Sequence, residues 1–174
     1  MLNTRHEKRE KGFTLIELMI AIAILAIALA LGMPGYQSWI QNTRIRNAAE
    51  SMLNGLQAAR MEAVQRNHGI KFELAAGTGW KVSCEPVDAV CADDPIQERT
   101  ASEGSSSAIN VDPAAVTIVF NALGRSDGTY ALDIDSSAVS ASEQRPLRVT
   151  VDVGGISRMC DPDSGLDASD PRKC

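Results

Sequence analysis

The residues of this chain that could do acid–base or metal chemistry are few and scattered. A hydrolase triad or a zinc site needs a histidine near its nucleophile or fellow ligands, yet the only histidines, His6 and His68, lie far apart. The acidic segment DPDSGLDASD, residues 161–170, lacks the calcium-binding spacing of glycine at position six and glutamate at position twelve. The sequence therefore predicts no enzyme, no cofactor and no metal site.

Four cysteines form two close pairs along the chain, Cys84 with Cys91 and Cys160 with Cys174. Neither pair has the C-x-x-C spacing of a zinc or redox site, and an even number of cysteines in an exported domain is typical of disulfides. The sequence leaves three pairings open. We favour the two local bonds because each closes a loop within one hairpin or tail. Four reduced thiols would require the opposite membrane topology.

A single carboxylate, Glu17, interrupts an otherwise apolar run at residues 13–33. The 21 residues of this run are enough to cross a bilayer as a helix. A secretory signal peptide would have a shorter apolar core followed by a small-residue cleavage site, and this sequence has no such site after the run. Four bases precede the run and place the N-terminus in the cytoplasm and the remainder outside: Arg5, Lys8, Arg9 and Lys11.

The position of Glu17 invites two interpretations. An acid in mid-membrane costs about 2.5–3.5 kcal/mol, and Glu17 could lower this cost by reaching back to the interface. Alternatively, cleavage after Gly12 would make Phe13 a charged amino terminus one helical turn from Glu17. The amine of one copy could then pair with the carboxylate of a neighbour, and an unpaired charge in lipid would penalise a misplaced subunit.

The segment KGFTLIEL, residues 11–18, resembles the prepilin motif of type IV pilins and type II secretion pseudopilins. The resemblance implies cleavage between Gly12 and Phe13 by a membrane prepilin peptidase, followed by N-methylation of Phe13. It also implies that Glu17 guides docking through the terminal amine of a neighbouring pilin. A competing class, a single-span sensor with a periplasmic ligand domain, predicts no cleavage, and a leader of twelve residues is short for a cytoplasmic effector.

The sequence divides into a leader at 1–12, a transmembrane helix at 13–33, its amphipathic continuation at 34–67 and a periplasmic head at 68–174. We expect one long helix over 13–67, bent near Pro34 and ended by Gly69 as a left-handed stop. Apolar residues spaced by three and four predict the helix face that packs on the head: Ile45, Ala49, Met52, Leu56, Ala59 and Ala63.

The head shows the alternating, β-branched segments that are typical of strands, separated by glycine-rich turns. Strands are predicted at 70–75, 80–84, 117–121, 129–134, 147–152 and 156–160, with hairpin turns at 77–79 and 154–155 and exposed loops at 99–110 and 136–144. These elements predict an α+β fold in which an antiparallel sheet or a small β-sandwich rests on the long helix.

Several segments narrow the resemblance to minor pilins and pseudopilins of the GspH/FimT type. They are SMLNGLQAARMEAVQRN at 51–67, GW at 79–80, FNALG at 120–124 and RMCDP at 158–162. This resemblance implies a low-abundance subunit that primes or tips a type IV pilus, joins other pilins and works with the inner-membrane assembly platform. Cys160 and Cys174 resemble the tail cysteines of the pilus members, which favours a pilus over a type II secretion system.

DNA is an alternative partner, because some FimT-type minor pilins bind DNA through a Gly-Arg-x-Arg motif before the tail cysteine. Here the matching residues are GISR at 155–158, so Ile156 replaces the first arginine. Arg158, Arg172 and Lys173 remain as candidate phosphate contacts. The net charge of −5 gives no general nucleic-acid footprint.

Overall fold

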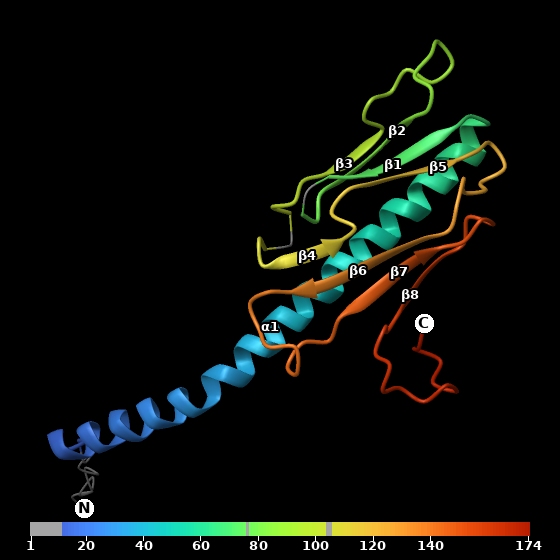
Figure 1. Cartoon of the computed structure of the whole chain (residues 1–174). Coiled ribbons are helices and arrows are strands. Elements are labelled where there is room, and N and C mark those ends of the chain that lie inside the picture. The colour runs from blue at the N-terminus through green and yellow to red at the C-terminus, as the bar shows by residue number, and fades with distance from the viewer. Residues whose placement is uncertain (1–11, 76, 104–105) are drawn as a thin grey trace, which may run out of the picture. The chain divides into compact units, whose positions relative to one another are not determined.

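The computed structural model describes residues 12–75, 77–103 and 106–174 (Figure 1). The predicted leader therefore lies outside the described residues, apart from Gly12. The chain divides into two compact units, Met1–Tyr36 and Gln37–Cys174. The first unit carries the beginning of helix α1, and the second, here called the head, carries the rest of that helix and every strand found in the described residues.

Helix α1 spans Leu15–Arg66 and includes Pro34 without a break in its assignment. The predicted helix over 13–67 is thus confirmed to within two residues at its start and one at its end, whereas its bend near Pro34 stays a prediction. Among the described residues, α1 is the one helix that is long and apolar enough to cross a membrane, judged by length and composition.

The C-terminal end of α1 corrects the predicted role of Gly69. The residue with left-handed backbone is Asn67, with φ of 50°. The amide of His68 donates to the carbonyl of Ala63 at 3.1 Å, and the amide of Asn67 donates to the carbonyl of Val64 at 3.3 Å. These two bonds form a Schellman cap, in which asparagine tolerates the conformation that the prediction assigned to glycine.

Gly69 is required for a different reason, which is the close approach of two backbones. A Cβ atom at this position would collide with the carbonyl oxygen of Glu85. The Glu85 amide also donates a 2.8 Å hydrogen bond to the carbonyl of Gly69. The chain therefore leaves the helix directly against the segment that follows β2.

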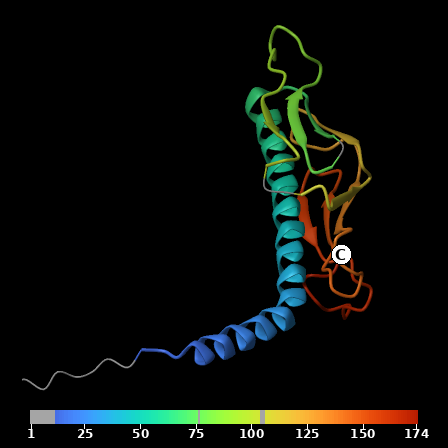
Figure 2. The same ribbon diagram turned by 90° about the vertical axis from the view of Figure 1, so that its left-hand side faces the viewer.

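Within the described residues, eight strands form two antiparallel sheets of four strands each, arranged beside the head part of α1 (Figure 2). The first sheet has the order β3-β2-β1-β5, and the second has the order β4-β6-β7-β8. The strand bounds are β1 Ile70–Leu74, β2 Trp80–Cys84, β3 Gln97–Arg99, β4 Ile109–Asp112, β5 Val116–Phe120, β6 Tyr130–Ser136, β7 Leu147–Val151 and β8 Ser157–Cys160.

The six predicted strands are present, with bounds that differ by at most two residues, and both predicted hairpins join antiparallel neighbours. Strands β3 and β4 were not predicted, so the loop expected at 99–110 is wrong at both ends. Strand β3 is polar and lies at a sheet edge, paired only with β2. The predicted loop at 136–144 begins one residue later, because Ser136 ends β6.

One hydrophobic core joins α1 to both sheets. The predicted helix stripe is confirmed, since all six of its residues are fully buried. The first sheet contributes inward side chains that include Phe72 and Phe120, and the second contributes side chains that include Leu132 and Val149. The fold is therefore a long helix whose second half carries two antiparallel sheets, as the sequence predicted.

Candidate assembly segment and head surface

The start of α1 positions Glu17 through a helix cap. The Glu17 amide donates to the Thr14 hydroxyl oxygen at 3.2 Å, and the Leu18 amide donates to the Thr14 carbonyl at 3.1 Å. Thr14 is therefore the N-cap, and Glu17 occupies the acidic position of a Thr-x-x-Glu capping box. A carboxylate in the first turn also interacts favourably with the helix dipole.

Thr14 was not among the predicted site residues, although the spacing of a capping box would have indicated it. Phe13 directly precedes this N-cap and is 86% exposed. Both predicted processing residues, Gly12 and Phe13, lie before the first helical residue. Cleavage between them would leave the capped turn and Glu17 unchanged.

The first unit presents an apolar surface around its helix. Every large apolar side chain between Leu15 and Met33 that is described is more than half exposed, from 53% at Ile20 to 79% at Leu31. A helix that is apolar on all sides is typical of burial in a membrane or among other helices. This surface and the single acid in its first turn make residues 13–33 the candidate assembly segment.

Both predicted cysteine pairs are joined in the structure. The Cys84–Cys91 bond is buried at the end of β2. The Cys160–Cys174 bond ties β8 to the chain's last residue, and the tail returns beside Asp161, whose amide donates to the Arg172 carbonyl at 2.6 Å. Among the described residues, no group of three or more histidine, cysteine or acidic side chains could hold a metal ion.

The three candidate DNA contacts do not form a cluster of available cations. Arg172 binds both carboxylate oxygens of Asp170, at 3.1 and 2.7 Å, and this contact lowers the pKa of Asp170 to about 2. The Lys173 ammonium donates to the carbonyl of Leu166 at 2.8 Å. The side chain of Arg158 is exposed on edge strand β8 and makes no hydrogen bond or ion pair with other side chains among the described residues.

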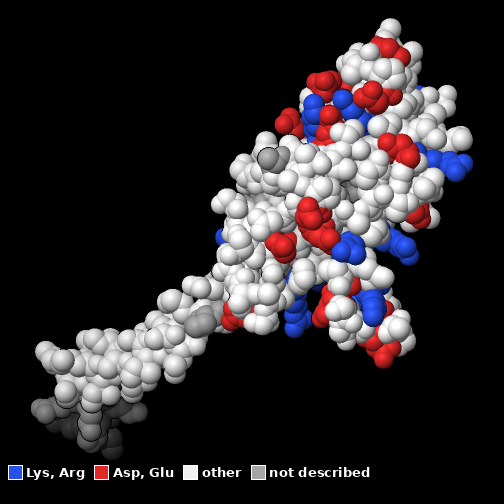
Figure 3. Space-filling view, in the orientation of Figure 1, with Lys and Arg blue, Asp and Glu red and all other residues white. Residues whose placement is uncertain are grey.

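A groove of about 790 Å³ separates the first turns of the head helix from the disulfide-closed tail. Its walls are partly apolar, through Trp39, Leu147 and Met159, and partly basic, through Arg46, Arg145 and Arg172. Two of these three arginines have an acidic partner, because Arg46 pairs with Glu50 at 2.9 Å and Arg172 pairs with Asp170 at 2.7 Å. Figure 3 shows a comparable mixture of blue and red side chains on the visible face of the head.

The fold and the apolar helix together define a structural subunit of the type IV pilin or pseudopilin class. Residues 48–155 match the family described as "Type II transport protein GspH", and residues 8–33 match the prokaryotic N-terminal methylation motif. Because the first match covers more than half of the chain, this protein belongs to the GspH family. The known members of this class are structural proteins, not enzymes.

Similar proteins agree with this assignment. A fimbrial protein of Pseudomonas aeruginosa is 42% identical over 57 residues, which are 33% of this chain and 36% of the relative. The type IV major pilin protein PilE of Neisseria gonorrhoeae is 41% identical over 70 residues, which are 39% and 41% of the two chains. The matches thus span well under half of the relatives' length.

Two solved structures share the fold at low sequence identity. The type IV minor pilin FimU of Pseudomonas aeruginosa has a TM-score of 0.54 at 16% identity, covering 70% of this chain and 91% of that chain. The minor pseudopilin EpsH of the type 2 secretion system of Vibrio cholerae has a TM-score of 0.52 at 14% identity, covering 70% and 99%.

Proposed function

We propose that this protein is a minor pilin that takes part in priming or tipping a type IV pilus. Prepilin peptidase removes residues 1–12, and Phe13 becomes an N-methylated amino terminus. The segment 13–33 holds the subunit in the bacterial inner membrane as a single span. The predicted amphipathic continuation at 34–67 and the rest of the chain through residue 174 lie in the periplasm. The assembly platform then transfers the subunit among other pilins.

The observation that carries this proposal is the placement of Glu17. It is an exposed acid in the capped first turn of α1, and the large apolar side chains between Leu15 and Met33 that follow this turn's start are all more than half exposed. The methylation motif at residues 8–33 covers the same turn. A carboxylate in an apolar assembly needs a cation, because an unpaired buried charge is strongly unfavourable, and a neighbour's terminal amine supplies one.

The proposal is tested by replacing Glu17 with valine in the native protein, produced at its native level. We expect Glu17→Val to leave membrane insertion and leader cleavage intact and to reduce recovery of the subunit in sheared pili. Glu50→Gln is the matched control, since Glu50 is an exposed head acid on the same helix. Normal recovery of Glu17→Val would contradict the role of this acid in docking.

A second candidate function, a pseudopilin of a type II secretion system, is favoured by the description of the matching family. The two functions place the same subunit in different machines. Deletion of the gene, followed by scoring of surface pili, protein secretion and transformation in parallel, separates them. Loss of pili with normal secretion supports the pilus role, whereas loss of secretion alone supports the pseudopilin role.

A further inference from the structure

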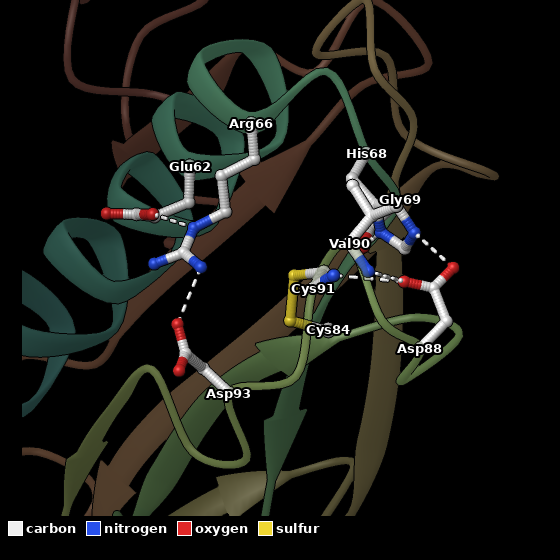
Figure 4. Close-up of a disulfide and its surroundings, with 9 residues drawn as sticks. All are labelled: Glu62, Arg66, His68, Gly69, Cys84, Asp88, Val90, Cys91 and Asp93. Atoms are coloured by element: carbon white, nitrogen blue, oxygen red, sulfur yellow. Dashed lines mark hydrogen bonds and ion pairs between the residues drawn. A yellow bond between two sulfur atoms is a disulfide. The ribbon is translucent and has the colours of Figure 1, made fainter.

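A small loop at the end of the head is organised around one carboxylate, that of Asp88. The loop runs from Cys84 to Cys91 and is closed by their disulfide (Figure 4). One oxygen of Asp88 accepts hydrogen bonds from the amides of Val90, at 2.8 Å, and Cys91, at 2.9 Å. The Asp88 amide donates to the Cys91 carbonyl at 3.0 Å. The shape of the loop therefore depends on where this carboxylate is held.

The other oxygen of Asp88 faces His68, whose amide takes part in the cap at the end of α1. The distance from this oxygen to Nε2 of His68 is 3.1 Å. The second ring nitrogen, Nδ1, lies 3.0 Å from the carbonyl oxygen of Gly69. A carboxylate and a carbonyl are both acceptors, so each ring nitrogen must carry a proton for both hydrogen bonds to form. The geometry is thus satisfied only by the imidazolium form of His68.

The surroundings of His68 favour the charged ring. The hydrogen bond to the Gly69 carbonyl and then the Asp88 carboxylate raise the pKa of His68 above its ordinary value of 6.5. Hydrogen bonds from the Cys91 amide, His68 and the Val90 amide lower the pKa of Asp88 below 3.8. The His68 side chain is only 14% exposed, so water replaces these partners poorly.

The other charged groups near the loop have partners of their own. Arg66 binds Glu62 at 2.7 Å and Asp93 at 2.6 Å, on the far side of the disulfide (Figure 4). Nζ of Lys71 lies 3.3 Å from Oε2 of Glu85, which is at the start of the loop. None of these groups changes its charge between about pH 5 and 8 in ordinary circumstances, whereas His68 does.

We propose that His68 and Asp88 form a pH-sensitive latch that ties the Cys84–Cys91 loop to the end of α1. A histidine whose folded pKa is raised contributes stability that is fully present below its unfolded pKa and is lost as the pH rises through the folded value. The latch is therefore closed in mildly acidic solution, where His68 is protonated. It opens as the pH rises above the pKa of His68 in the folded protein. The neutral ring has one proton and keeps only one of its two hydrogen bonds.

Opening of the latch is confined to the loop, because the contacts of Arg66 with Glu62 and Asp93 persist when His68 loses its proton. The segment released at higher pH carries two exposed apolar side chains, those of Val87 and Val90, which are 52% and 77% exposed. The latch thus controls how firmly this apolar tip is presented to solvent. It is a property of the head and holds whichever machine contains the subunit.

The test is an NMR titration of the full chain in detergent micelles. The His6→Gln background leaves His68 as the only imidazole. We expect the His68 ring nitrogens to titrate with a midpoint above 6.5. We also expect hydrogen-exchange protection of the Val90 and Cys91 amides, corrected for intrinsic rates, to fall several-fold across the same interval. A midpoint at or below that of a free histidine, or protection that does not change with it, overturns the proposal.

Two variants separate the latch from a general effect of charge. Asp88→Asn is expected to lower the midpoint of the His68 titration. The control is Glu85→Gln, which removes another acid of the same loop, one that pairs with Lys71 of β1, and it should leave the midpoint unchanged. Equal shifts in the two variants would overturn the assignment of Asp88 as the partner. If Asp88→Asn fails to fold, the titration of the parent chain and the flat protection expected for His68→Gln still decide the matter.

Discussion

The indole nitrogen of Trp80 donates a 2.9 Å hydrogen bond to the hydroxyl of Ser51, which joins strand β2 to helix α1 inside the core. Both residues are 5% exposed. The Ser51→Ala variant would leave the buried indole N–H without its partner, which costs about 1–3 kcal/mol. We expect the free energy of unfolding of the head, measured by denaturant titration in micelles, to fall by about this amount. Asn54→Ala, at an exposed position of the same helix, should change it by less than about 0.5 kcal/mol, and equal effects of the two variants would refute the role of Ser51.

Gly55 lets α1 approach the aromatic side chains of the first sheet. A Cβ at Gly55 would lie 2.9 Å from ring atoms of both Phe72 and Trp80, whose centroids are 5.8 Å apart. We expect Gly55→Ala to destabilise the head, because overpacking of about 1–3 kcal/mol exceeds the helix-propensity gain of up to about 1 kcal/mol. Gly35→Ala, on the same helix with no neighbouring atom within 4 Å, should cause no loss. Thermal unfolding measures the stability of both variants. A Gly55→Ala variant more stable than the parent would show that the aromatic rings move aside to make room for the methyl group.

The two disulfides should differ in their resistance to reduction. Cys84 and Cys91 are 0% and 1% exposed, whereas Cys174 is exposed at the end of the tail. Thiol–disulfide exchange requires access of the attacking thiolate to sulfur. We expect a mild reductant to open the Cys160–Cys174 bond first, as measured by alkylation and peptide mass spectrometry over time. Earlier alkylation of Cys84 or Cys91 would mean that their loop opens more readily than its burial indicates.

Among the three candidate DNA contacts, we expect Arg158 alone to support DNA binding. Arg172 and Lys173 already bind groups of the tail, and one phosphate contact gives a slope of about −0.9 for log affinity against log salt. In a mobility-shift titration of the full chain, we expect weak binding with such a slope, abolished by Arg158→Ala and little changed by Arg172→Ala. A steep slope, or equal loss in both variants, would show that the tail rearranges to gather its cations.

The helix and its buried stripe could be predicted because they repeat over many turns. A period of three and four residues from Ile45 to Ala63 leaves one interpretation of which face is buried, and the structure buries that face. The same period cannot reveal that Gly55 leaves room for the Trp80 ring or that Ser51 accepts its hydrogen bond. Ser51 and Trp80 are 29 positions apart, and their hydrogen bond exists only once β2 lies against the helix.

The missed elements were short and had weak local patterns. Strand β3, Gln97–Arg99, has no apolar residue, and β4, Ile109–Asp112, has only two inward positions before Pro113. Strand β3 pairs with β2 and β4 pairs with β6, and in each case a long connection separates the two strands along the chain. The choice of Asn67 over Gly69 for the left-handed position was likewise undetermined locally, because either residue suits a helix end.

The central claim is that this chain is processed to a subunit whose new amino terminus lies one turn from Glu17. Intact-mass spectrometry of the protein purified from its native membrane tests the claim directly. We expect a chain that begins at Phe13, carries one added methyl group and contains two disulfides. A native chain that retains residues 1–12 would lack the terminal amine that is to pair with Glu17, and would contradict the proposed assembly.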